Sequence, residues 1–288
     1  MLTDLFITVN GLRLHLADWG GPPNAGHILL VHGLASNAKI WNYVAPLLAK
    51  HSRVAALDQR SHGQSDEAAD GDYSFAAVGE DIHAVRAGMK LNRLIIVGHS
   101  WGASVALEYA AQHPDSVRGI VLVDGGFMTL GKRMTWPEAE ERLAPPRLIG
   151  TPVEAFRERV KGFTGDRYSD ELFNIILGNF EVRPDNTIAP HLAFENHLKI
   201  VRAMWEADPE TVYPQVHCPA LFLPCLPPEP HDEMTKEFMH ARREGSELAQ
   251  RLMPRAQVEW LADSIHDVPL QRPELVAQKI RAFVESIR

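Results

Sequence analysis

The chain has 288 residues, of which 45% are hydrophobic and 23% charged, as is typical of a soluble globular protein with a sizeable core. Its formal net charge of -8 and the lack of a basic run argue against nucleic acid and anionic membranes as partners. Two cysteines make no disulfide framework, and the sequence predicts no signal peptide and no membrane span, so we expect a cytoplasmic protein.

The first part of the chain alternates between strands and helices. Asn10-Gly11 joins two alternating runs within residues 6–19, which predicts a β-hairpin. Buried strands are predicted at residues 27–33, 54–58, 94–97 and 118–124, and helices at residues 42–50, 76–88 and 103–112. Strands that alternate with helices at this spacing indicate parallel βαβ units beneath the hairpin.

The pattern changes at residues 125–216, where strand-like runs vanish and aromatic residues become frequent. Apolar residues recur there at helical spacing, as from Phe173 to Phe180. We predict a helical insertion whose aromatic side chains mainly form its own core, while a few line a pocket above the sheet. Strands return at residues 219–223 and 256–261, and helices are predicted at residues 232–252 and 274–287.

Ser100 is the predicted nucleophile. It lies in Gly98-His99-Ser100-Trp101-Gly102, between the apolar strand at residues 94–97 and the helix at residues 103–112. A sharp strand-to-helix turn exposes the serine above the sheet and requires glycine or a very small residue beside it. The amino end of the following helix favours negative charge that develops near the serine. A tight turn without a catalytic role is the alternative for this segment.

A serine needs a general base, and the base in turn needs a carboxylate that orients it. His266 is predicted as the base because it lies in a loop between the last strand and the closing helix. Asp124 is the favoured carboxylate because it ends the strand that follows the nucleophile along the chain, with two glycines after it. Glu229, in a proline-rich loop after the strand at residues 219–223, is the alternative acid.

The segment around Ser100 and the loop after His32-Gly33 predict two N–H donors for an oxyanion hole. Trp101 follows the nucleophile directly, and Leu34 follows His32-Gly33 at the end of an earlier strand. His32 and His62 are interpreted as histidines that brace their loops by hydrogen bonding. Sequence motifs for a metal site or a phosphate-binding loop are missing, so we predict no metal and no cofactor.

These motifs together resemble the α/β-hydrolase superfamily. The resemblance rests on His32-Gly33, on the segments at residues 58–63, 98–103 and 273–277, and on the late His266. It implies an α/β fold with a mostly parallel eight-stranded sheet flanked by helices. Its core comprises residues 1–124 and 217–288, and residues 125–216 form a helical cap over the active site.

Two departures from the family pattern matter for the expected chemistry. The acid after the seventh strand is not in its usual Asp form, which leaves Asp124 and Glu229 as candidates. A serine rather than an aspartate at position 100 argues against haloalkane dehalogenase or soluble epoxide hydrolase chemistry.

The function expected from these residues is hydrolysis of carboxylic esters of small to medium hydrophobic substrates, through an acyl-enzyme. Carbon–carbon bond hydrolysis and cofactor-free perhydrolysis use the same three residues and stay open as alternatives. A small-molecule receptor that has kept the pocket and lost turnover is the alternative outside enzymes. Oligomeric state and acyl length are left open by the sequence.

Overall fold

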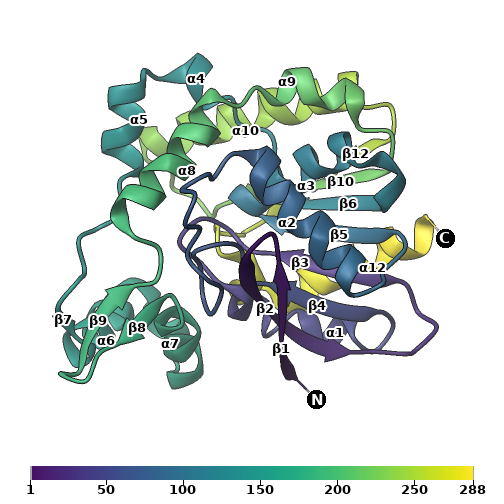
Figure 1. Ribbon diagram of the computed structural model, residues 1–288. Helices are drawn as coiled ribbons and strands as arrows, with labels where there is room; N and C mark the ends of the chain where they lie inside the picture. Colours follow the sequence, from purple (N-terminus) through teal and green to yellow (C-terminus); the bar gives the residue numbers. More distant parts are fainter. Residues whose placement is uncertain (1, 288) are drawn as a thin grey trace.

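The computed structural model describes residues 2–287, so Met1 and Arg288 of the predicted core lie outside the described residues. At its centre is an eight-stranded sheet with the strand order β1-β2-β4-β3-β5-β6-β10-β12 (Figure 1). The strands are β1 (Thr3–Val9), β2 (Leu12–Gly20), β3 (His27–Val31), β4 (Arg53–Leu57), β5 (Leu94–His99), β6 (Val117–Val123), β10 (Ala220–Leu223) and β12 (Ala256–Val258). Strand β2 runs antiparallel to both neighbours, and the pairs from β4 to β12 are parallel. The predicted α/β fold with a mostly parallel sheet is confirmed.

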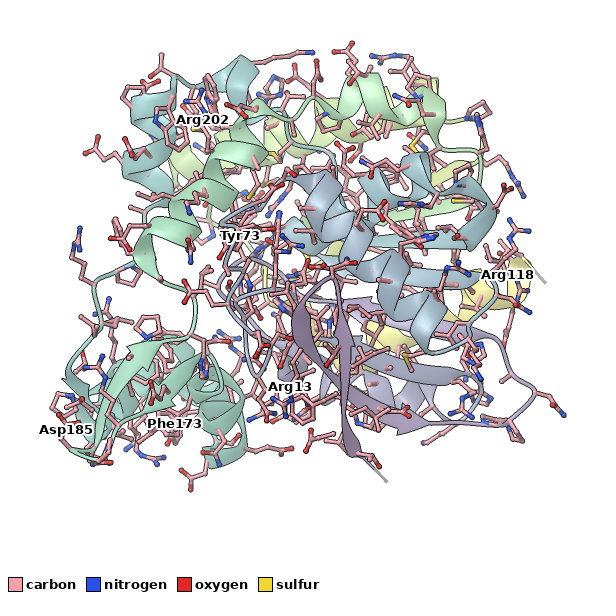
Figure 2. The ribbon with its side chains drawn as sticks, viewed as in Figure 1. Arg13, Tyr73, Arg118, Phe173, Asp185 and Arg202 are labelled. Atoms are coloured by element: carbon pink, nitrogen blue, oxygen red, sulfur yellow. The ribbon has the colours of Figure 1, made fainter. Side chains whose placement is uncertain are left out.

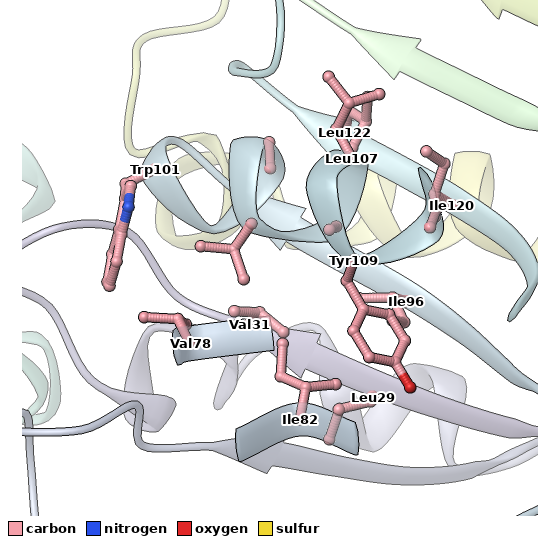
Figure 3. Close-up of a cluster of buried hydrophobic side chains, with 14 of the residues drawn as sticks. Leu29, Val31, Val78, Ile82, Ile96, Trp101, Leu107, Tyr109, Ile120 and Leu122 are labelled. Atoms are coloured by element: carbon pink, nitrogen blue, oxygen red, sulfur yellow. The ribbon is translucent and has the colours of Figure 1, made fainter. Parts of the chain in front are cut away.

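Helices cover both faces of this sheet. They are α1 (Ala45–Leu48), α2 (Phe75–Gly88), α3 (Trp101–Gln112), α10 (Glu233–Leu252), α11 (Val268–Gln271) and α12 (Pro273–Ser286), with 3₁₀ turns η1 (Ala38–Trp41) and η2 (Pro114–Ser116). Along β5, Leu94 and Ile96 belong to the apolar cluster that includes side chains of α2 and α3, whereas Ile95 and Val97 pack with side chains of α1 and α12. Figure 3 shows Ile96 in the first cluster. Burial on both faces explains the unbroken apolar runs of the parallel strands. Within residues 2–287, no helix combines the length and the apolar character needed to cross a membrane.

The beginning of the chain confirms one local prediction and contradicts another. The hairpin turn at Asn10-Gly11 has φ angles of 51° and 77°, as a two-residue turn between twisted antiparallel strands requires. The helix predicted over residues 42–50 is wrong in its extent, because the structure has the 3₁₀ turn η1 followed by the short α1. Pro46 has no N–H and cannot donate to the carbonyl of Asn42, so an α-helix that begins there is not formed.

The last strand is also shorter than predicted. Strand β12 ends at Val258, and a separate strand β13 (Leu261–Ala262) pairs with β11 (Cys225–Leu226). Pro224 separates β10 from β11 and lacks the N–H that a continuous ladder would use. The interruption places the chain after β13 beside the end of β6, where the predicted site residues lie.

Residues 125–216 contain helices and, against the prediction, a small sheet. The elements are α4 (Leu130–Arg133), α5 (Trp136–Leu143), β7 (Thr151–Pro152), α6 (Val153–Thr164), η3 (Gly165–Arg167), α7 (Asp170–Leu177), β8 (Phe180–Val182), β9 (Thr187–Pro190), α8 (Phe194–Glu206), α9 (Pro209–Val212) and η4 (Tyr213–Gln215). The predicted absence of strands is wrong, because β7, β9 and β8 form an antiparallel sheet. These strands have two to four residues, too few to produce an alternating pattern in the sequence.

The insertion has two parts that differ in position. The small sheet, α6 and α7 form a lobe at the lower left of Figure 1, whereas α4 and α5 lie above it with α8 between. The lobe has its own apolar core, in which Phe173 packs against Phe156. Figure 2 shows the position of Phe173 in this lobe. The aromatic residues in this part of the insertion therefore include structural core residues, as the helical spacing indicated.

Candidate active site

Ser100 lies at the sharp turn between β5 and α3. Its backbone has φ 55° and ψ -122°, a conformation that residues other than glycine rarely adopt. The turn is tightly packed, since a Cβ atom on Gly98 would lie 2.1 Å from the carbonyl oxygen of Gly102. The amide of Ser100 donates to the carbonyl of Val123 at 2.9 Å, which ties the turn to the end of β6. Glycine at position 98 and the strained φ of Ser100 agree with the turn predicted from the sequence.

His266 and Asp124 complete a continuous chain of contacts with this serine. The Nε2 atom of His266 lies 3.0 Å from Ser100 Oγ. Its Nδ1 atom lies 2.6 Å from Asp124 Oδ2, which fixes Nδ1 as the protonated nitrogen because the carboxylate can only accept. Nε2 is then free to accept the proton of the serine hydroxyl. The structure brings these three predicted residues together over distances of 166 and 142 residues along the chain.

Asp124 is fixed in place from several sides. Its side chain has no exposed surface, and its Oδ1 atom accepts a hydrogen bond from the amide of Cys225 at 2.9 Å. Its Oδ2 atom accepts from Arg242 Nη2 at 2.7 Å in addition to His266. Burial alone would raise the pKa of Asp124, but the hydrogen bond and charge of His266, with Arg242 and the Cys225 amide, hold that pKa below its ordinary value. The carboxylate is therefore ionised when it faces His266.

The imidazole of His266 lies at the surface of the site, with 50% of the side chain exposed. Its partial desolvation lowers the pKa, but the hydrogen bond and the negative charge of Asp124 outweigh this effect and raise the pKa of His266 above its ordinary value. A base with a raised pKa holds an abstracted proton more firmly. The contact therefore favours proton transfer from Ser100 to His266.

The two predicted oxyanion donors lie beside the serine. Trp101 is the first residue of α3 (Figure 3), so its amide has no acceptor within the helix. Leu34 lines the same cavity as Ser100, and a Cβ atom on the preceding Gly33 would lie 2.9 Å from the Cβ atom of Ser100. The Leu34 amide and the Trp101 amide therefore come from two different segments that both adjoin Ser100.

Two buried histidines hold the peptide groups on both sides of Leu34. His32 donates from Nδ1 to the carbonyl of Gly33 at 2.7 Å, and His62 accepts at Nε2 from the amide of Ala35 at 3.3 Å. Because a trans peptide is planar, fixing the Gly33 carbonyl also fixes the direction of the Leu34 N–H. Burial lowers the pKa of His32. Burial and the nearby His32 lower the pKa of His62 to about 3. Both histidines therefore stay neutral and keep these hydrogen bonds. Their interpretation as braces agrees with these contacts.

Two cavities meet at Ser100 and His266. Polar atoms form a larger share of the wall in the first cavity, here called the polar cavity, although apolar side chains line it as well. It has a volume of about 240 Å³ and is lined by Leu34, Asn37, Phe163, Thr164, Arg167 and Asn179, among others. The apolar cavity has a volume of about 220 Å³ and is lined by Phe75, Leu107, Phe127, Leu130, Met204 and Phe238, among others. Both cavities include side chains from residues 125–216. Space for a bound molecule therefore extends from the serine in two directions.

Glu229, the alternative acid, lies away from this arrangement. Its side chain is 86% exposed, and its carboxylate lies 4.0 Å from Nδ1 of His231. Its carboxylate has no hydrogen bond or ion pair with His266 in the described part of the chain. Among residues 2–287 there is also no cluster of three or more His, Cys, Asp or Glu side chains arranged to hold a metal ion.

Two contacts of the site were not predicted. His99 donates from Nε2 to the backbone carbonyl of His266 at 2.8 Å, which anchors the loop that carries His266. Its place directly before Ser100 is a signal that could have identified it. Arg242 comes from the polar helix α10, where one arginine among many charged residues gives no such signal.

Comparison with known proteins assigns the chain to a family. The sequence profile of the alpha/beta hydrolase fold family matches residues 26–174. The chain belongs to this family. It is 32% identical to N-formylmaleamate deformylase of Pseudomonas putida over 160 residues, which are 56% of this chain and 55% of that protein. It is 39% identical to an uncharacterised protein of Mycobacterium tuberculosis over 124 residues, 43% of this chain and 35% of that protein.

The chain thus spans between a third and a little over half the length of these two relatives. Among solved structures, E-2-(acetamidomethylene)succinate hydrolase superimposes with a TM-score of 0.79 at 20% identity, over 99% of this chain and 100% of that one. At this identity the superposition establishes the fold alone.

Proposed function

We propose that the protein is a serine hydrolase that cleaves carboxylic esters of small to medium hydrophobic compounds through an acyl-enzyme. The observation that supports this most directly is the chain of contacts from Ser100 Oγ to His266 at 3.0 Å and from His266 to Asp124 at 2.6 Å. A hydroxyl, a neutral imidazole in the correct tautomer and an ionised carboxylate are the groups that acyl transfer requires.

In the proposed reaction, Ser100 Oγ attacks the acyl carbon while His266 Nε2 takes the hydroxyl proton. The amides of Leu34 and Trp101 donate hydrogen bonds to the oxyanion of the tetrahedral intermediate, each with an effect on the order of a hundredfold in rate. His266 then gives its proton to the departing alcohol. Water repeats the sequence on the acyl-enzyme, which releases the acid and restores Ser100.

A direct comparison of substrates identifies the type of bond that the protein cleaves. N-formyl amides are a second candidate class, because the deformylase of Pseudomonas putida is among the relatives of this chain. The decisive experiment measures turnover of p-nitrophenyl esters of increasing acyl length, N-formyl amides and vinylogous diketones by the same preparation, with perhydrolysis measured on added hydrogen peroxide. Ester turnover at least tenfold above the other reactions supports the proposal. Turnover only of an amide or a diketone contradicts it, and tight binding without any turnover supports the receptor alternative.

Residues 125–216 are proposed to act as a cap that sets the choice of substrate and shields the site from water. Met204→Ala shortens a side chain of the apolar cavity, and Phe163→Ala does the same in the polar cavity. We expect each variant to change the ratio of kcat/KM between long and short acyl esters by about tenfold, because a lost apolar contact acts on the longer chain.

The matched control for these variants is Ile149→Ala. Ile149 is a large exposed apolar residue of the same insertion and lines neither cavity. Its replacement should leave the acyl-length profile unchanged. If the profiles of Met204→Ala and Phe163→Ala also match the wild type, the insertion has no role in substrate choice.

A further inference from the structure

Arg242 of α10 contacts the carboxylate that faces the proposed base. Its Nη2 donates to Asp124 Oδ2 at 2.7 Å, the oxygen that also accepts from His266 at 2.6 Å. Its Nη1 donates to the carbonyl of Cys225 at 3.3 Å, and the amide of Cys225 donates to Asp124 Oδ1 at 2.9 Å. Arg242, Asp124 and Cys225 thus form a closed ring of hydrogen bonds that holds both oxygens of the carboxylate.

The reach of Arg242 depends on how closely α10 approaches the loop after β6. Gly245 is buried, and a Cβ atom there would lie 2.0 Å from the backbone oxygen of Phe127. The helix backbone therefore packs directly on this loop. Arg242 is three residues earlier and lies on the same face of the helix, so its guanidinium extends over Asp124.

We propose that Arg242 is a positioning residue of the site: it holds the carboxylate of Asp124 against His266 and offsets part of the carboxylate's negative charge. The proposal rests on the proposed function, in which His266 is the base that activates Ser100. It goes beyond that function because it adds a cation to the three residues that perform acyl transfer.

The charged groups around His266 determine in which direction its pKa should change when Arg242 is replaced. Asp124 at the end of β6 and Asp267 in the same loop raise the pKa of His266, whereas Arg242 on α10 lowers it. His99 at the end of β5 is neutral, since burial and the adjacent His266 lower its pKa to about 4. Removing the charge of Arg242 removes the cation that opposes the carboxylates, so the pKa of His266 rises. The neutral, active form of the base then predominates only at higher pH.

The experiment compares the pH dependence of Ser100 labelling by a fluorophosphonate probe in the wild type and in three variants. Arg242→Gln and Arg242→Met both remove the charge. Arg242→Met also keeps an apolar side chain beside the apolar cavity. In both, the acidic limb of the rate profile is expected at higher pH, with labelling roughly tenfold slower at a pH below the wild-type limb. Arg242→Lys keeps the charge and is expected to keep the limb. Arg251→Gln, an exposed arginine of the same helix, is the matched control and should keep it too.

The outcomes separate Arg242 from the proposed function. A role in packing alone would lower the labelling rate equally at every pH, and an unmoved limb in both neutral variants overturns the proposal. If wild-type Ser100 is not labelled at any pH, the proposed function fails. Titration of the His266 imidazole by NMR then still tests Arg242, because its midpoint must rise in Arg242→Gln and Arg242→Met. An unchanged midpoint contradicts the proposal whatever the protein hydrolyses.

Discussion

Ser100→Ala is expected to lower kcat on a p-nitrophenyl ester on the order of a millionfold, since no other group can replace the attacking oxygen. The hydroxyl contacts His266 at 3.0 Å and has no other hydrogen bond within residues 2–287, so its removal leaves no buried group without a partner. The steric cost of a φ of 55° is also similar for alanine and serine, since both carry a Cβ atom. The melting temperature should therefore stay within a few degrees of the wild type, which corresponds to a change in the free energy of unfolding of less than about 1 kcal/mol.

Covalent labelling tests the same assignment without a substrate. A fluorophosphonate probe is expected to form one adduct, which mass spectrometry places on the peptide that contains Ser100. Ser286→Ala, at the exposed end of α12, makes the same substitution elsewhere and should leave both labelling and turnover unchanged. An adduct on another serine, or turnover that survives in Ser100→Ala, would falsify the assignment of the nucleophile.

The parts of the fold that followed from the sequence are those with repeated local signals. Buried parallel strands such as β5 produce apolar runs because both of their faces are covered, and Asn10-Gly11 supplies the φ angles of a hairpin. The small sheet in the insertion was missed because strands of two to four residues have no measurable period. The break between β12 and β13 depends on Pro224 in a neighbouring strand, which a reading of residues 256–261 alone does not include.

The site divides in a similar way. Ser100 and Trp101 follow from one local motif, and His266 follows from its place after the last strand, although their catalytic roles stay predictions. The choice between Asp124 and Glu229 was open because it depends on the path of a proline-rich loop. Arg242 was not predictable, because its contact needs the direct approach of α10 at Gly245, which involves residues that are distant in the sequence.

Asp124→Asn is expected to lower kcat on the order of ten-thousandfold. The amide of Cys225 donates to Oδ1, so the asparagine oxygen must take that position and its NH₂ group must face His266 and Arg242. A donor then faces Nδ1 of His266, which has to become the acceptor. The imidazole proton moves to Nε2, and a protonated Nε2 cannot take the proton of Ser100. The pH dependence of kcat and the melting temperature distinguish this loss of base function from unfolding.

Glu229→Gln is the matched substitution at the alternative acid, since both variants replace a carboxylate with an amide of the same shape. Glu229 is 86% exposed and its carboxylate faces His231 rather than His266. Because solvent screens an exposed charge, the loss of the Glu229 charge should change kcat by less than about twofold. The comparison is decisive because the two predictions differ by several powers of ten in one assay. Near-native turnover in Asp124→Asn, with turnover abolished in Glu229→Gln, would mean that the loop after β11 moves over His266 during catalysis and that Glu229 orients the base.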